Sequence, residues 1–196
     1  MSTTIRTGGL IALLAVLAGC AGRDFVRPSP EAFRLGHTTY AQVVERMGES
    51  RAVSDGVQNG QKVRSITYRY TTTTDTSWET GVVPVRTVVF YFHQERLVGY
   101  AFVSSFKTDS TDFDETKLAA LSKGHTTRAE VLQLLGQPSA YYIPPMVTAT
   151  AGEAIGYGYA RREASGRYRA FSKTLRITFD AQDRVADIAY TSSGVK

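Results

Sequence analysis

Hydrophobic residues in this chain follow two alternating periods, and the whole pattern occurs twice. Val43, Val44 and Met47 have the spacing of one face of an α-helix, and the residues at 131, 132 and 135 repeat that spacing. The four residues before each set are identical, Gly-His-Thr-Thr at 36–39 and again at 124–127, so the offset is 88 residues (124 minus 36). A unit that recurs at a fixed offset indicates two tandem copies of one structural repeat.

Beyond each helical segment the hydrophobic period changes from 3.6 to 2, which is typical of half-buried β-strands. Ile66, Tyr68 and Tyr70 alternate with polar residues, and 155–159 repeats this alternation. Further along each copy, two apolar runs flank a polar turn, at 93–96 and at 180–184, and these are predicted to be antiparallel hairpins.

The Gly-His-Thr-Thr segments are predicted to be corners between two helices. The glycine would end a first helix, over 30–35 in one copy and 114–123 in the other, in the left-handed conformation that glycine tolerates. The second threonine would cap the next helix through a capping box with the Gln or Glu three residues later. The residues with this structural role are Gly36, Thr39, Gly124 and Thr127.

These elements together predict an α+β fold of two tandem α-α-β-β-β repeats, each with room for a fourth strand. The repeats would cover 29–108 and 109–196, with helical pairs packed on antiparallel sheet. The pattern leaves open whether the strands form two adjacent sheets or one continuous curved sheet. In either arrangement the helices would cover one face and leave the other partly open.

The N-terminal residues have a different character, with one charge, Arg6, and an unbroken apolar run over 10–18. This run is too short to span a bilayer and is typical of an export signal, predicted here as 1–19. It ends in Leu17, Ala18, Gly19 and Cys20, which resembles the lipobox of bacterial lipoproteins. The resemblance implies that Cys20 carries a diacylglycerol and an N-acyl chain, the only cofactor-like groups that we expect. Residues 20–28 are then predicted to be a tether.

The predicted cellular location limits the possible partners. In lipoproteins of this class Asp after the cysteine retains the protein in the inner membrane, so Ala21 predicts an outer-membrane protein that faces the periplasm. Loss of Arg6 with the signal leaves 22 basic and 18 acidic residues, a net charge of +4. Since an exported chain does not meet nucleic acid, this charge favours an anionic lipid or an acidic protein surface, or is simply solvated.

The segments Gly36 to Gly48 and Gly124 to Pro138, each followed by an antiparallel meander, resemble the SmpA/OmlA domain of the BamE-like family. The first copy departs from the family at Glu49-Ser50, where Gly-x-Pro is usual. The tandem arrangement is similar to that of the β-lactamase inhibitor proteins. The resemblance implies a non-catalytic outer-membrane lipoprotein that binds the β-barrel assembly machinery and anionic phospholipid.

The sequence holds no clear catalytic or metal-binding motif. His37 and His125 have no cysteine or carboxylate beside them at the spacing of metal ligands, and no nucleophile elbow or phosphate-binding loop occurs. We therefore expect no metal and no enzymatic activity.

Two surfaces are candidates for binding. The first is a basic and aromatic hairpin turning at 165–166, whose residues are Arg161, Arg162, Arg167, Tyr168 and Arg169. These residues suit lipid phosphates or an acidic protein, but they also suit a solvated strand edge. The second is the open sheet face, where exposed aromatics would hold an enzyme loop or a small ligand; Tyr91, Tyr100 and Phe102 are the candidates.

Overall fold

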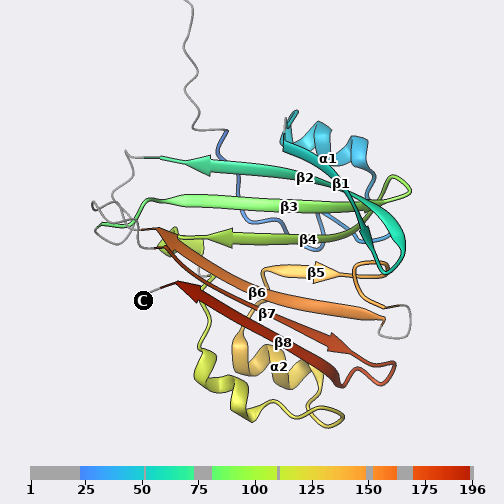
Figure 1. The fold of residues 1–196 in the computed structure, drawn as a ribbon, viewed down its shortest axis with the longest axis vertical. Coiled ribbons are helices and arrows are strands. Elements are labelled where there is room, and N and C mark those ends of the chain that lie inside the picture. The colour runs from blue at the N-terminus through green and yellow to red at the C-terminus, as the bar shows by residue number, and fades with distance from the viewer. Residues whose placement is uncertain are drawn as a thin grey trace, which may run out of the picture.

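The computed structural model describes residues 23–50, 52–72, 81–109, 111–148, 152–162 and 170–194. Within them, eight strands form one sheet in the order of the chain, so that every neighbour in sequence is also a neighbour in space (Figure 1). The strands are β1 (Ala52–Gln58), β2 (Gln61–Thr71), β3 (Val85–His93), β4 (Arg96–Ser104), β5 (Ala140–Tyr142), β6 (Glu153–Arg162), β7 (Ala170–Phe179) and β8 (Val185–Gly194).

The short strand β5 is the seam between the two halves of the sheet. It pairs antiparallel with β4 on one side and with β6 on the other. Because β5 has only three residues, β4 and β6 meet directly beyond its end, where Ser104 and Tyr159 form a parallel bridge. The two repeats therefore share one continuous sheet.

The predicted α+β fold of helical pairs on a sheet is wrong, because most of the described structure is this eight-stranded sheet. Within the described residues each copy has one short α-helix, α1 (Tyr40–Met47) and α2 (Arg128–Leu135). The helix predicted over 30–35 is a turn, and its counterpart over 114–123 contains only the 3-10 helix η2 (Glu115–Ala120). A second 3-10 turn, η1 (Lys107–Asp109), lies in the segment between the copies.

The missing helices have a simple physical explanation. The six residues 30–35 cannot form enough hydrogen bonds to offset the cost of helix nucleation, so this segment makes a single turn onto the carbonyl of Ser29. In the second copy Leu118 and Leu121 both pack on the core, and a spacing of three residues puts them on one side of a 3-10 helix.

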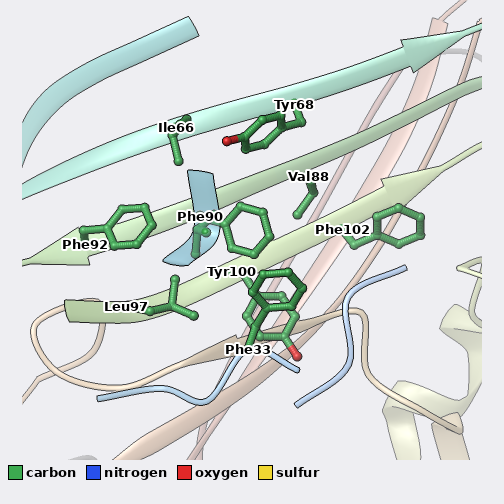
Figure 2. Packing of buried hydrophobic residues seen from close by; sticks show 10 residues of the cluster. Phe33, Ile66, Tyr68, Val88, Phe90, Phe92, Leu97, Tyr100 and Phe102 are labelled. Atoms are coloured by element: carbon green, nitrogen blue, oxygen red, sulfur yellow. The ribbon is translucent and has the colours of Figure 1, made fainter. Parts of the chain in front are cut away.

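One face of the sheet carries the two main hydrophobic clusters. The first repeat buries side chains of β2, β3 and β4 under α1 and Phe33, and Figure 2 shows Ile66, Tyr68 and Phe90 directed to this same side. The second repeat buries Leu175, Ile177 and other residues under α2 and η2. We call this covered side the helical face and the opposite side the open face.

Both Gly-His-Thr-Thr corners are attached to the tip of a hairpin in the same way. The amide of Gly36 donates to the carbonyl of Leu97 at 2.7 Å, and the amide of Gly124 donates to the carbonyl of Val185 at 2.7 Å, again 88 residues on. The predicted capping boxes at Thr39 and Thr127 are both present. The four corner residues are thus structural parts that fix each α-helix to its own hairpin.

Candidate functional site

The open face is lined by small residues where the two repeats meet. Facing residues there are Gly99 and Ala101 of β4, Ala140 of β5, and Gly156 and Gly158 of β6. A Cβ atom on Gly156 would lie 2.9 Å from the Cβ of Ala140 and 3.2 Å from the carbonyl oxygen of Leu175. The backbones and side chains approach so closely that only glycine fits, and the surface is hollowed there.

The ring of Tyr142 lies over two of these glycines. A Cβ atom on Gly99 would be 2.8 Å from Cδ1 of Tyr142, and one on Gly156 would be 3.4 Å from its Cε2. Tyr91 lies beside it, with the ring centroids 6.3 Å apart. At one end of the face, the loop after β5 places Met146 against Val63 and Val98 in a small third cluster. The tyrosines are therefore held in place from below and from one side.

These residues border a groove of about 390 Å³ that runs across the seam. The small residues of β4, β5 and β6 form its floor, and Tyr91 and Tyr142 form one wall. The far side is lined by polar residues of β7 and β8, including Thr174 and Thr191, whose hydroxyls are hydrogen-bonded to each other at 2.7 Å. We call this site the seam groove.

Among the described residues that line the seam groove, Arg176 is the one with a charged side chain. It is exposed and stands between Gly156 of β6 and Ala189 of β8, and neither of these cross-strand neighbours has a side chain large enough to cover it. Burial raises the pKa of the Tyr142 hydroxyl, nearby Tyr91 adds to this, and the charge of Arg176 acts in the opposite direction. At neutral pH the groove therefore offers a neutral phenol and a cation.

The described residues of the groove have a chemistry that suits binding. An apolar floor with a few polar groups and one cation suits a side chain of a partner together with a carboxylate. General acid–base chemistry at neutral pH most often uses a histidine or a carboxylate, and neither is among the described residues that line the groove. Across the described residues, no three His, Cys, Asp or Glu side chains gather to form a metal site.

The three histidines have different surroundings. Nδ1 of His93 lies 2.9 Å from the carbonyl oxygen of Lys62, and Nδ1 of His125 lies 3.0 Å from that of Lys123. His37 contributes its backbone carbonyl, which accepts a hydrogen bond from Arg96. The histidines are distributed over separate turns rather than brought into one site.

The structure separates the aromatic residues proposed for the open face. Tyr91 lies on that face, beside the seam groove. Tyr100 and Phe102 are instead buried in the core of the helical face, so their assignment to the open face is wrong (Figure 2). The reason is register: Phe90 pairs with Tyr100 and Val88 with Phe102, which places all four side chains on one side of the sheet.

The basic hairpin is only partly described. Arg161 and Arg162 end β6, where the carbonyl of Arg162 accepts a hydrogen bond from the amide of Val83 at 2.8 Å. Arg167, Tyr168 and Arg169 lie outside the described residues, as do Leu17, Ala18, Gly19 and Cys20. Among the described residues no helix is long and apolar enough to cross a membrane.

Sequence reasoning missed Tyr142 and Arg176. A usable signal was present, because Gly156 and Gly158 alternate with Ile155 and Tyr157, and this places one face of that strand against close neighbours. The pairing of β6 with β5 could not be predicted from the same residues, so the position of Tyr142 over Gly156 was not predicted.

Comparison with known proteins gives no further guide to the site. No protein family matches the chain, no curated protein matches it, and no solved structure matches it.

Proposed function

We propose that this chain is an outer-membrane lipoprotein, anchored through Cys20 and facing the periplasm, that works as a non-catalytic protein-interaction module. The seam groove is the observation that carries the binding part of this proposal, because it joins an apolar hollow to an exposed cation. The anchor rests on the four residues Leu17 to Cys20 and on the apolar run before them.

The proposed role of the module is in envelope assembly, with the β-barrel assembly machinery as the candidate partner. The support is the likeness of both Gly-His-Thr-Thr corners to BamE-like domains, together with the outer-membrane address. Anionic phospholipid is a second candidate partner on the same grounds. No metal, no nucleic acid and no catalytic residue enters this proposal.

The test combines the anchor and the groove. Full-length protein is expressed in a Gram-negative host with a photo-crosslinking residue at Thr174 in the groove, or at Gln133 on the exposed side of α2 as a matched control. We expect a discrete crosslinked complex with an assembly component from position 174 only, reduced at least several-fold by Arg176→Glu. Equal crosslinking from both positions, or no assembly component, would reject the role.

The anchor has its own readout. Mass spectrometry of the mature N-terminus should find an acylated cysteine, and Cys20→Ala should remove the acyl chains and release the protein from membranes. An unmodified Cys20 in a membrane fraction would reject the lipoprotein assignment while leaving the groove untouched.

A second candidate function is an inhibitor-like or ligand-binding module. It is favoured by Tyr91 and Tyr142, two half-buried aromatic rings on the wall of the open face. The two functions differ in partner, since an inhibitor should form a stable complex with one soluble enzyme. Recovery of such a complex from position 174, with no assembly component, would support this alternative.

A further inference from the structure

Residues 23–28, which we call the strap, lie against the folded body. The carboxylate of Asp24 is 2.6 Å from Nη1 of Arg86, whose side chain is only 14% exposed. The ring of Phe25 packs edge-on against Phe102, with centroids 6.3 Å apart. Pro28 is buried. The tether predicted over 20–28 is therefore fixed to the protein from residue 24 onward.

The strap also contacts both repeats. The guanidinium of Arg27 donates to the carbonyl of Asp109, in the segment between the repeats, at 3.3 Å. It donates as well to the carbonyls of Gln137 at 2.9 Å and Pro138 at 2.6 Å, in the loop that follows α2. Asp24 meanwhile holds β3 of the first repeat. The position of the strap is thus set by both halves of the sheet.

The strap begins at one end of the molecule. Arg23 and Asp24 border a groove of about 710 Å³ together with the C-terminal end of α1 and the middle of β2. Figure 1 shows the first described residues, in blue, near β2, while β8 forms the opposite end of the sheet. The start of the strap is therefore beside the first repeat and far from the outer strand of the second.

The surface around this end has a composition that suits a bilayer interface. Among the described residues, Val26 is the most exposed of the large hydrophobic ones, at 82%. Arg23, Arg46 and Arg69 are exposed on the same groove. The carboxylates among its described lining residues are those of Glu49 and Asp24, both exposed, and Asp24 is paired with Arg86. Arginine side chains can reach phosphate groups while their stems rest on apolar surface.

We propose that the strap holds the first repeat against the membrane surface, with Val26, Arg23, Arg46 and Arg69 at the lipid headgroups and the second repeat pointing away. This inference rests on the proposed lipidation of Cys20. Cys20 precedes Arg23 by three residues, which span at most about 10 Å even when fully extended. Because the folded body is fixed to the strap at Asp24 and Arg27, it can lie no further than this short span from the lipidated residue. The first repeat must therefore stay beside the bilayer.

The orientation gives the anchor a second purpose beyond attachment. The bilayer supplies phosphate groups in any phospholipid, zwitterionic ones included, so the contact does not depend on an anionic lipid. β8 and α2 are held on the far side, and the edge of β8 is left for contacts in the periplasm. A flexible tether of the same length without the clamp would let the body rotate and would favour no end.

The test measures the distance of two labelled positions from the bilayer. Lipidated full-length protein is placed in neutral phosphatidylcholine vesicles with a fluorescent label at Glu49→Cys, near the strap, or at Gln182→Cys, in the turn before β8. Lipids with a nitroxide quencher on the headgroup are then added. We expect at least a threefold larger quenching of the label at 49 than of the label at 182.

Two variants separate orientation from anchoring. Asp24→Ala combined with Arg27→Ala releases the strap and should bring the two labels within twofold of each other. Arg34→Ala, at an exposed arginine six residues after the end of the strap in the sequence, should leave the contrast unchanged. Circular dichroism checks that each variant is folded. Equal quenching in the unaltered protein, or a contrast that survives release of the strap, overturns the inference. If the protein does not float with the vesicles, the proposed anchor is rejected as well. If it floats but the two labels are quenched equally, only the proposed orientation is rejected.

Discussion

Arg86 and Lys173 occupy equivalent positions in the two repeats, and both pair with carboxylates of the segment that joins them. In the register of the strands Arg86 lies opposite Tyr70 and Ser104, and Lys173 lies opposite Tyr159 and Ser192. Nε of Arg86 lies 2.7 Å from Asp109, and Nζ of Lys173 lies 2.8 Å from Asp112 and 3.3 Å from Glu115. The described ends of the joining segment, at 109 and at 112–115, are thus each tied by ion pairs to a cation of the neighbouring repeat.

The Arg86–Asp109 pair should be important for stability. Its two side chains are 14% and 10% exposed, and Ser104 also donates to the carboxylate at 2.5 Å. Asp109→Asn would leave a mostly buried guanidinium without its main counter-charge, so we expect a loss of about 3 kcal/mol in the free energy of unfolding. Urea denaturation measures this loss.

An exposed pair provides the control for that measurement. Asp55 and Arg64 form an ion pair whose side chains are 75% and 44% exposed. Asp55→Asn should change the free energy of unfolding by less than about 0.5 kcal/mol because water already solvates both charges. Equal losses at positions 55 and 109 would show that the joining segment is not held by its charge pairs.

The floor of the seam groove should not tolerate even one added methyl group. A Cβ atom at position 156 would meet Ala140 at 2.9 Å and the backbone of Leu175 at 3.2 Å. We expect Gly156→Ala to destabilise the protein by about 1–3 kcal/mol, because the backbone must shift to make room. Thermal unfolding gives the measurement.

Gly56 is a matched control for Gly156, because it also lies in a strand but an added Cβ would have no described residue within 4 Å. Gly56→Ala should be neutral or stabilise slightly, since alanine restricts the unfolded chain. If both alanines have the same effect, close packing at the seam does not explain the glycines of β6.

Local sequence signals predicted the local parts of this fold correctly. The capping boxes at Thr39 and Thr127 depend on residues three apart. Such features need no knowledge of distant contacts. The same holds for the hairpin of β3 and β4, which short-range alternation made visible.

The helical pairs failed for the opposite reason. Gly36 and Gly124 do adopt positive φ, as a helix end would, but each follows a turn that is fastened to a distant hairpin through Leu97 or Val185. Those partners are some 60 residues away in the chain. Local spacing does not reveal them, so it predicted the end of a helix at each glycine where the structure has a turn. The seam groove was missed likewise, because it exists only once β5 pairs with β4 and β6.

Two buried tyrosines should respond in opposite directions to loss of their hydroxyl. The hydroxyl of Tyr100 is buried and has no hydrogen-bond partner within the described parts of the chain. That of Tyr157 donates to the carbonyl of Gly136 at 2.9 Å. Tyr100→Phe should therefore stabilise the protein by about 1 kcal/mol, and Tyr157→Phe should destabilise it by about 1 kcal/mol. Urea denaturation of both variants at pH 7 checks the contrast, which a shared sign of the two changes would contradict.

Stability should fall above pH 10, and Tyr68 should account for part of the fall. Burial raises the pKa of Tyr68 to about 12, with smaller contributions from Tyr40 and Glu49. A tyrosine in the unfolded chain titrates near pH 10, so above that pH ionisation favours unfolding while the folded hydroxyl keeps its proton and its 2.7 Å hydrogen bond to Gly48. The contribution is fully present below about pH 10 and is lost as pH rises towards 12, by about 1 kcal/mol at pH 11.

Tyr68→Phe removes the titrating group, so the free energy of unfolding of this variant should decline less steeply between pH 9 and pH 11.5 than that of the unaltered protein. If urea denaturation shows parallel declines for the two proteins, the alkaline loss arises from other groups. Lys173 is one of them: burial lowers its pKa, but the carboxylates of Asp112 and Glu115 outweigh burial and raise it.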